Sequence, residues 1–125
     1  MEKHLLHPER LRTIPPQFSW IDQRLVREHY IERLSHAADA LYLFLLTVAD
    51  ARGLSFYSEH SIGRHLAMAA DRLDTARKEL VRADLIAYQR PLYQVLSLDG
   101  PQLGAERGTG ICSIREVFKK LGGAA

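Results

Sequence analysis

Hydrophobic and polar positions change their spacing several times along the chain. After Ser19, apolar residues recur every three to four positions, which is typical of an amphipathic helix: Ile21, Leu25, Val26, Tyr30, Ile31 and Leu34. We expect this helix to begin at Ser19, because serine often caps helix N-termini. Asp22 would then stand in the first turn, where a carboxylate suits the helix dipole.

A second helix is predicted from Ser35, as its N-cap, to about Arg52, with Gly53 just past its end as a C-cap. Its apolar residues surround nearly the whole helix: Leu41, Leu43, Phe44, Leu45, Leu46 and Val48. A helix without a polar face must be covered on most sides. Because one small domain does not readily cover it all, we expect part of the helix Ser35–Arg52 to form the seam of a homodimer.

The remaining part of the folded region alternates between strand and helix character. Pro91 has no backbone N–H to donate to a strand pair, so Arg90-Pro91 marks a turn between two strands. The predicted elements are a short strand at 54–57, a helix from the cap Ser58 through Leu66, a helix from Ala70 to Asp84, and strands at 85–88 and 92–96. This order predicts an α+β fold that is mainly α with a small β-hairpin.

Proline and glycine mark the two ends of the chain. Residues 1–17 hold three of the five prolines and are expected to form an arm with little structure of its own. Residues 99–125 hold six of the eight glycines and read as a loose tail, in which 113–121 has the pattern of a short helix. The folded domain is therefore expected at residues 18–98.

One stretch resembles a known DNA-binding motif. Residues 62–68, Ile-Gly-Arg-His-Leu-Ala-Met, resemble the first helix and turn of the winged helix-turn-helix family. The buried positions of that family's recognition helix are matched by Leu73, Ala76 and Leu80, and the pair that starts its wing by Leu85-Ile86. The resemblance implies a winged helix-turn-helix fold over 18–98. Bacterial and mobile-element members of the family bind DNA.

Two positions depart from the family pattern. Ala69 stands where the recognition helix usually has a Ser or Thr cap, and Asp84 stands where the turn before the wing usually has Gly. Aspartate tolerates the left-handed backbone that such a turn needs, so we expect the fold to survive both changes.

The helical repeat of about 100° per residue predicts which side chains face the solvent. If Leu73, Ala76 and Leu80 face inward, the outer face of that helix presents Asp71, Asp74, Thr75, Lys78 and Arg82, while Arg77 lies closer to the core. A recognition helix enters the major groove, where such residues meet base edges and phosphates. The candidate DNA-binding residues are Arg64, Arg72, Thr75, Lys78, Arg82 and Arg90, the last at the tip of the hairpin.

Charge supports this hypothesis only in part. The net charge is +2. Between residues 58 and 90, six Lys and Arg face five Asp and Glu. Asp71 and Asp74, at the start of the outer face, either repel phosphate or accept a hydrogen bond from cytosine. Two functions therefore stay open. One is binding of double-stranded DNA as a transcription regulator or as an accessory of plasmid replication or a mobile element. The other is a winged helix that binds proteins and not DNA.

The sequence gives little support for other classes of function. The single cysteine, Cys112, excludes an internal disulfide framework and a cysteine-based zinc site. No histidine pair in the folded region has metal-ligand spacing, and no nucleophile and base stand in a catalytic pattern, so we expect no enzyme, cofactor or metal. No apolar run approaches the ~20 residues of a membrane span, and the N-terminus lacks a secretory pattern. We expect a cytoplasmic protein.

Overall fold

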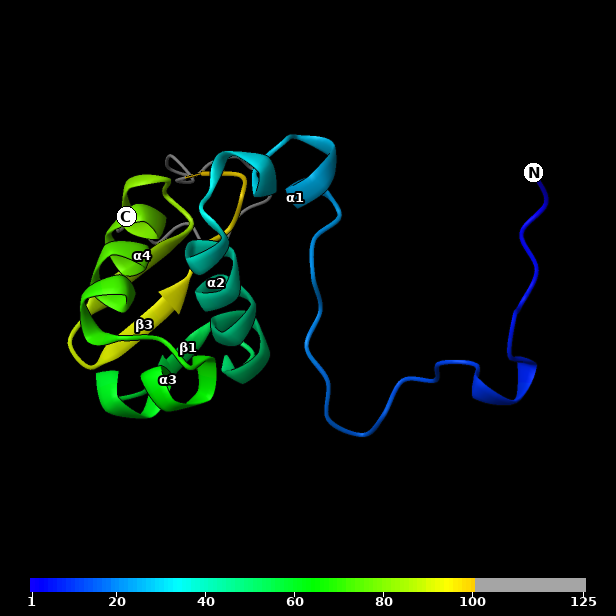
Figure 1. The fold of residues 1–125 in the computed structure, drawn as a ribbon, viewed down its shortest axis with the longest axis horizontal. Coiled ribbons are helices and arrows are strands. Elements are labelled where there is room, and N and C mark those ends of the chain that lie inside the picture. The colour runs from blue at the N-terminus through cyan, green and yellow to red at the C-terminus, as the bar shows by residue number, and fades with distance from the viewer. Residues whose placement is uncertain (101–125) are drawn as a thin grey trace, which may run out of the picture.

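The computed structural model describes residues 1–100, which contain a small α+β domain with four α-helices and one three-stranded antiparallel sheet. The elements are η1 (Pro8–Arg10), α1 (Arg24–Arg27), η2 (Ile31–Arg33), α2 (His36–Val48), β1 (Leu54–Phe56), α3 (Glu59–Leu66), α4 (Ala70–Arg82), β2 (Ile86–Gln89) and β3 (Leu92–Val95). Helices α2 and α4 pack against each other and against the sheet, with α3 at one end (Figure 1).

The core lies between α2, α4 and the sheet. Its fully buried side chains are mostly aliphatic: Leu41, Leu45, Ile62, Leu73, Leu80, Leu85, Ile86 and the aromatic Tyr93. On α4 the predicted inner face is confirmed, since Ala76 and Leu80 are 1% and 0% exposed, whereas the side chain of Lys78 is 68% exposed. The helical phase read from the sequence is therefore correct.

The predicted first helix is wrong in both its start and its length. Only the four residues of α1 are α-helical, and the separate 3₁₀ turn η2 follows. His29 lies between them with a φ of 66°, a left-handed conformation that interrupts the helix. The apolar spacing continues across the break, which is why the sequence pattern resembles one helix.

Ser19 does not cap this helix. Its hydroxyl donates a hydrogen bond to the carbonyl oxygen of Thr47, at the end of α2, over 3.0 Å. Asp22 takes part of the expected role, because its carboxylate accepts from the backbone N–H of Arg24 at 2.9 Å. The segment before α1 is thus held to α2 by a long-range contact that the local pattern does not reveal.

Helix α2 begins as predicted but ends earlier. The hydroxyl of Ser35 accepts from the N–H of Ala38, which confirms the cap. The helix ends at Val48 and not at Arg52, because the Asp50 carboxylate accepts from the N–H groups of Arg52 and Leu54 and closes a turn there.

Gly53 belongs to this turn and is not the C-cap of α2. Its φ is 84°, and a Cβ atom at this position would lie 2.7 Å from the carbonyl oxygen of Val95. The close approach allows β3 to pass directly beside the turn, so glycine is required here for two reasons.

The strands are found where the sequence predicts them, and their pairing extends the expected hairpin. β2 and β3 form the hairpin around Arg90-Pro91, and β1 pairs with the other edge of β3, which makes β3 the central strand. Tyr88 and Tyr93 are directly opposite, with ring centroids 4.5 Å apart, and form a cross-strand aromatic pair.

The first 20 residues are all exposed. Apart from η1 they have no regular structure, and Figure 1 shows them leading away from the folded body. The helix predicted at 113–121 falls outside the described residues.

Candidate nucleic-acid interface

The turn between α3 and α4 sets the angle between the two helices. Ala67 ends α3 with a left-handed φ of 52°, and the N–H of Met68 donates to the carbonyl of Gly63 at 3.0 Å. A Cβ atom on Gly63 would lie 3.0 Å from the carbonyl oxygen of Met68, so only a very small residue fits here without a shift. Ser58 caps α3 by accepting from the N–H of Ser61, as predicted.

Four of the six predicted DNA-binding residues are exposed on α4, three of them on its outer face and Arg72 on its flank. These residues are Arg72, Thr75, Lys78 and Arg82. The hydroxyl of Thr75 is engaged locally, since it donates to the carbonyl of Asp71 at 3.0 Å. Thr75 therefore presents its methyl group more freely than its hydroxyl.

The other two predicted residues lie on neighbouring elements. Arg64 is exposed on α3, and Arg90 is exposed in the turn between β2 and β3. The backbone of this turn meets the chain just before α3, because the N–H of Tyr57 donates to the carbonyl of Pro91 at 3.4 Å. The hairpin is therefore anchored next to the start of α3.

A buried arginine connects α3, α4 and the hairpin. Arg77 is 6% exposed, as expected from its position near the core, and its guanidinium lies 2.6 Å from Glu59 and 2.7 Å from Asp74. It also donates to the hydroxyl of Tyr93 at 3.3 Å and stacks 4.6 Å from the ring centroid of Tyr88. We call these five residues the Arg77 cluster. It fixes the hairpin relative to α4, which positions Arg90 relative to the α4 face.

The contacts of Asp74 change how its negative charge should affect DNA binding. Its carboxylate lies 2.9 Å from Lys78 in addition to its contact with Arg77. The hydrogen bond from Lys78, with the positive charges of Lys78 and Arg77, lowers the pKa of Asp74 below its usual 3.8. Asp74 is thus a carboxylate compensated by two cations of its own helix, and not a free negative charge.

A third carboxylate of this region is also engaged. Glu79 accepts from both the backbone N–H and the hydroxyl of Ser35, each at 2.7 Å, and so ties α4 to the start of α2. Of the five carboxylates between residues 58 and 90, Glu59, Asp74 and Glu79 therefore have internal partners.

What remains on this surface is positive. Among the described residues, no ion pair engages Arg64, Arg72, Arg82 or Arg90, and all four are exposed. Within residues 1–100, Asp71 and Asp84 also form no ion pair, although the Asp71 carboxylate accepts from the backbone N–H of Arg72 at 2.9 Å. The near balance of charge in the sequence thus becomes an excess of available cations in the structure.

Both positions that depart from the family pattern are accommodated. Ala69 precedes α4 in extended conformation without any side-chain hydrogen bond to the helix. Asp84 adopts a φ of 64°, the left-handed conformation expected for this turn.

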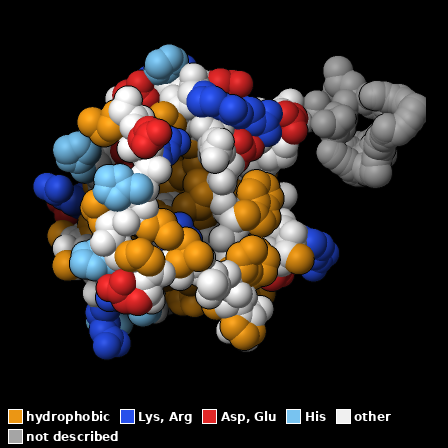
Figure 2. Space-filling model, turned by 90° about the vertical axis from the view of Figure 1, so that its right-hand side faces the viewer, with side chains coloured by type: hydrophobic (Ala, Val, Ile, Leu, Met, Phe, Trp, Pro, Cys, Tyr) orange, Lys and Arg blue, Asp and Glu red, His pale blue; other side chains and the backbone are white. Residues whose placement is uncertain are grey.

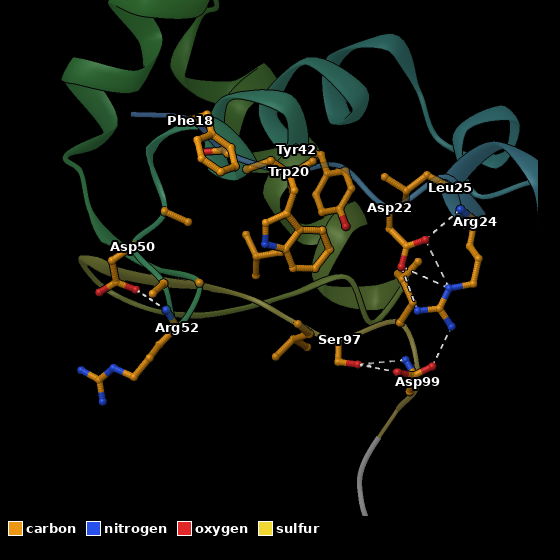
Figure 3. A pocket seen from close by; sticks show the side chains of 18 residues that line it. Phe18, Trp20, Asp22, Arg24, Leu25, Tyr42, Asp50, Arg52, Ser97 and Asp99 are labelled. Carbon is orange, nitrogen blue, oxygen red and sulfur yellow. Dashed lines mark hydrogen bonds and ion pairs between the residues drawn. The ribbon is translucent and has the colours of Figure 1, made fainter. Parts of the chain in front are cut away.

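The structure contains a second candidate site, a cavity of about 590 Å³ lined by the segment before α1, by α2 with the turn after it, and by the chain from Val95 to Asp99 (Figure 3). Aromatic side chains line part of it: Phe18, Trp20 and Tyr42. Phe18 and Trp20 pack only loosely on the domain, since they remain 63% and 75% exposed. They form an open wall of the cavity and not a closed core.

At the polar end of this cavity, one arginine is shared by two carboxylates. Arg24 binds Asp22 over 2.8 Å and Asp99 over 2.6 Å, and its hydrogen bonds lower the pKa of both carboxylates. Tyr42 is different. It is 6% exposed, and its burial, with the charge of Asp22 nearby, raises its pKa to about 12.

Comparison of the chain with protein-family models, curated proteins and solved structures gave no match. Within residues 1–100, no group of three or more His, Cys, Asp or Glu is placed to hold a metal ion. The helices of that part of the chain are too short or too polar to cross a bilayer.

Proposed function

We propose that this protein is a winged helix DNA-binding protein that uses α4 as its recognition helix and the β2–β3 hairpin as its wing. The observation that carries the proposal is the set of four exposed arginines, Arg64, Arg72, Arg82 and Arg90, which have no ion-pair partner among the described residues. Exposed cations without ion-pair partners are available for the phosphate contacts on which DNA affinity depends.

The order and packing of the elements support the same proposal. A helix–turn–helix formed by α3 and α4 is followed directly by a hairpin, and the Arg77 cluster holds the hairpin to α4. In such a fold, side chains on the outer face of the second helix reach the major groove while the hairpin follows the phosphate backbone. Thr75 is the residue best placed to affect sequence preference, and the arginines position the protein.

The biological role that we propose is regulation of transcription, or an accessory function in plasmid replication or in a mobile element. We further propose that the protein acts as a homodimer in the cytoplasm. A dimer would present two α4 helices to one duplex, which suits operator sites with twofold symmetry.

The experiment is a titration of a fluorescent duplex with the full-length protein, between about 50 and 200 mM salt. Replacing Arg72, Arg82 or Arg90 with Ala should weaken binding to all sequences alike and reduce the salt slope by about one unit each. Arg27→Ala is the matched control, because Arg27 is equally exposed but lies on α1, away from the proposed surface.

Acidic residues give a second readout. Asp71→Asn should raise affinity for random DNA, because it removes an uncompensated negative charge beside the phosphates. Asp74→Asn should raise it less, because Lys78 and Arg77 already compensate Asp74. If the wild type and the Asp71→Asn variant bind no duplex at low salt, the DNA proposal fails. In that case the alternative function, a protein-binding adaptor, takes its place.

A further inference from the structure

The N-terminal arm carries large apolar side chains that no other part of residues 1–100 covers. Leu5, Leu6, Leu11 and Ile14 are 54%, 81%, 61% and 77% exposed. Figure 2, which views the molecule from the side of the arm, shows hydrophobic side chains gathered around a hollow in the middle of this face. Exposed apolar surface of this extent is typical of an interaction site.

The cavity beside the arm contains a polar group that has no partner within residues 1–100. The ring of Tyr42 lies next to Trp20, and its hydroxyl points into the space between Trp20 and Asp22 (Figure 3). Tyr42 is only 6% exposed, and among the described residues no group forms a hydrogen bond with its hydroxyl. The hydroxyl faces the open space of the cavity, so a group that displaces solvent from the cavity must accept this hydrogen bond or leave the hydroxyl unpaired, which would cost free energy.

The arm is poorly placed to fill the cavity of its own chain. The cavity begins at Phe18, and Pro15 and Pro16 stand just before it. Proline restricts the residue before it to extended backbone, and its missing N–H cannot close a hydrogen-bonded turn. The chain only bends at residues 16–17 and does not fold back there, and Figure 1 shows the arm leading away from the body.

We propose that two copies of this chain exchange their arms, so that apolar side chains of one arm cover the Trp20–Tyr42 cavity of the other copy. Exchange of identical segments is a low-cost route to a closed, symmetric dimer. A backbone carbonyl of the incoming arm accepts the hydrogen bond of Tyr42. The proposal rests on the homodimer part of the proposed function and not on DNA binding, and it gives that dimer a defined seam.

The protein contains its own probe, because Trp20 is its single tryptophan. We would follow the emission of the full-length protein without DNA over a range of concentrations, together with its mass by sedimentation equilibrium. The expected result is a blue shift of the emission that appears with the same concentration dependence as the dimer. A blue shift that does not depend on concentration would overturn the proposal, because it means that the same chain covers the cavity.

Variants of the arm test the contact directly. Leu6→Asp combined with Ile14→Asp should weaken dimerisation by at least about 100-fold, because two charges would enter an apolar cavity. Val81→Asp is the control, since Val81 is an exposed apolar residue on α4, at a distance from the cavity (44% exposed). Dimerisation of the double variant with wild-type affinity would overturn the proposal.

Tyr42→Phe is a finer test. It removes only the unpartnered hydroxyl, so the monomer should be at least as stable as the wild type. Its dimer should be about five-fold weaker, the usual effect of one lost hydrogen bond. An unchanged dimer affinity would show that the Tyr42 hydroxyl does not donate a hydrogen bond to the incoming arm.

Leu43→Asp distinguishes a dimer formed by arm exchange from a dimer in which two α2 helices pack together. Leu43 is 55% exposed on α2 and does not line the cavity, so the substitution should affect only the second kind of dimer. If Leu43→Asp alone is monomeric while the arm variant dimerises, the dimer forms through α2 and the arm exchange is wrong. If the wild type is monomeric at high micromolar concentration, both the arm exchange and the homodimer fail, whereas DNA binding is judged by its own titration.

Discussion

Residues 35–98 and residues 1–34 differ in how far their apolar side chains are buried. In the first region, most apolar residues of α2, α4 and the sheet are buried or half-buried, with Leu43, Phe56 and Val81 as exposed exceptions. The buried Arg77 contacts side chains of α3, α4 and both hairpin strands. In the second region, Leu25 is the one buried residue, while aliphatic and aromatic side chains are left exposed. Most of the core belongs to the first region, and residues 1–34 add Leu25 to it. The second has the character of a segment that acquires its contacts from another molecule.

The largest expected difference between the two regions is in the cost of removing a leucine side chain. Leu45→Ala, in the fully buried part of α2, should lower the free energy of unfolding by about 2–5 kcal/mol, because it leaves a cavity. Leu6→Ala, in the arm, should change the stability of the monomer by less than about 0.5 kcal/mol. Urea unfolding of dilute protein measures both. Equal losses would show that the arm is part of the core.

Replacing one arginine in each region compares how much their charged side chains contribute to stability. Arg77→Met should destabilise the protein by about 2 kcal/mol, because Glu59, Asp74 and the Tyr93 hydroxyl lose a shared partner. The loss is moderate because both carboxylates are 42% exposed and can turn to water. Arg12→Met, in the arm, should be neutral within the error of the same unfolding experiment. A neutral Arg77→Met would mean that the cluster does not hold the hairpin in place.

Two serines that look alike in the sequence should behave differently. Ser35 caps α2 and also binds Glu79, so Ser35→Ala should cost about 1 kcal/mol. Ser19 caps no helix and makes one exposed hydrogen bond to Thr47, so Ser19→Ala should cost only a few tenths of a kcal/mol. Thermal unfolding distinguishes the two. A larger loss at Ser19 would indicate that it is the true cap.

The smallest effect should appear in acid. Because the pKa of Asp74 is lowered in the folded protein, its ion pairs stabilise the fold above the usual carboxyl pKa of 3.8, and this contribution is lost as the pH falls below it. The wild type should therefore be more stable than Asp74→Asn at pH 7, and the difference should shrink toward pH 3. Glu9→Gln, in the arm, is the control and should show no such convergence. A constant difference between wild type and Asp74→Asn would exclude this ion pairing.

The sequence by itself determined the features that depend on a few neighbouring residues. Ser35 and Ser58 cap helices because a serine hydroxyl satisfies an N–H three residues further along. The inner face of α4 follows from the helical repeat, and the hairpin follows from two apolar runs around Arg90-Pro91. All six predicted DNA-binding residues are exposed for the same reason, since helical phase and turn position fix which way a side chain points.

Only the tertiary structure decided which groups meet across the chain. The first helix breaks at His29, and Ser19 binds the end of α2, although the local pattern favours one continuous helix. The pairing of β1 with β3 and the convergence of Glu59, Asp74 and Tyr93 on Arg77 join residues far apart in sequence. These contacts turn a balanced set of charges into a surface with free arginines, because they engage the carboxylates from within the fold.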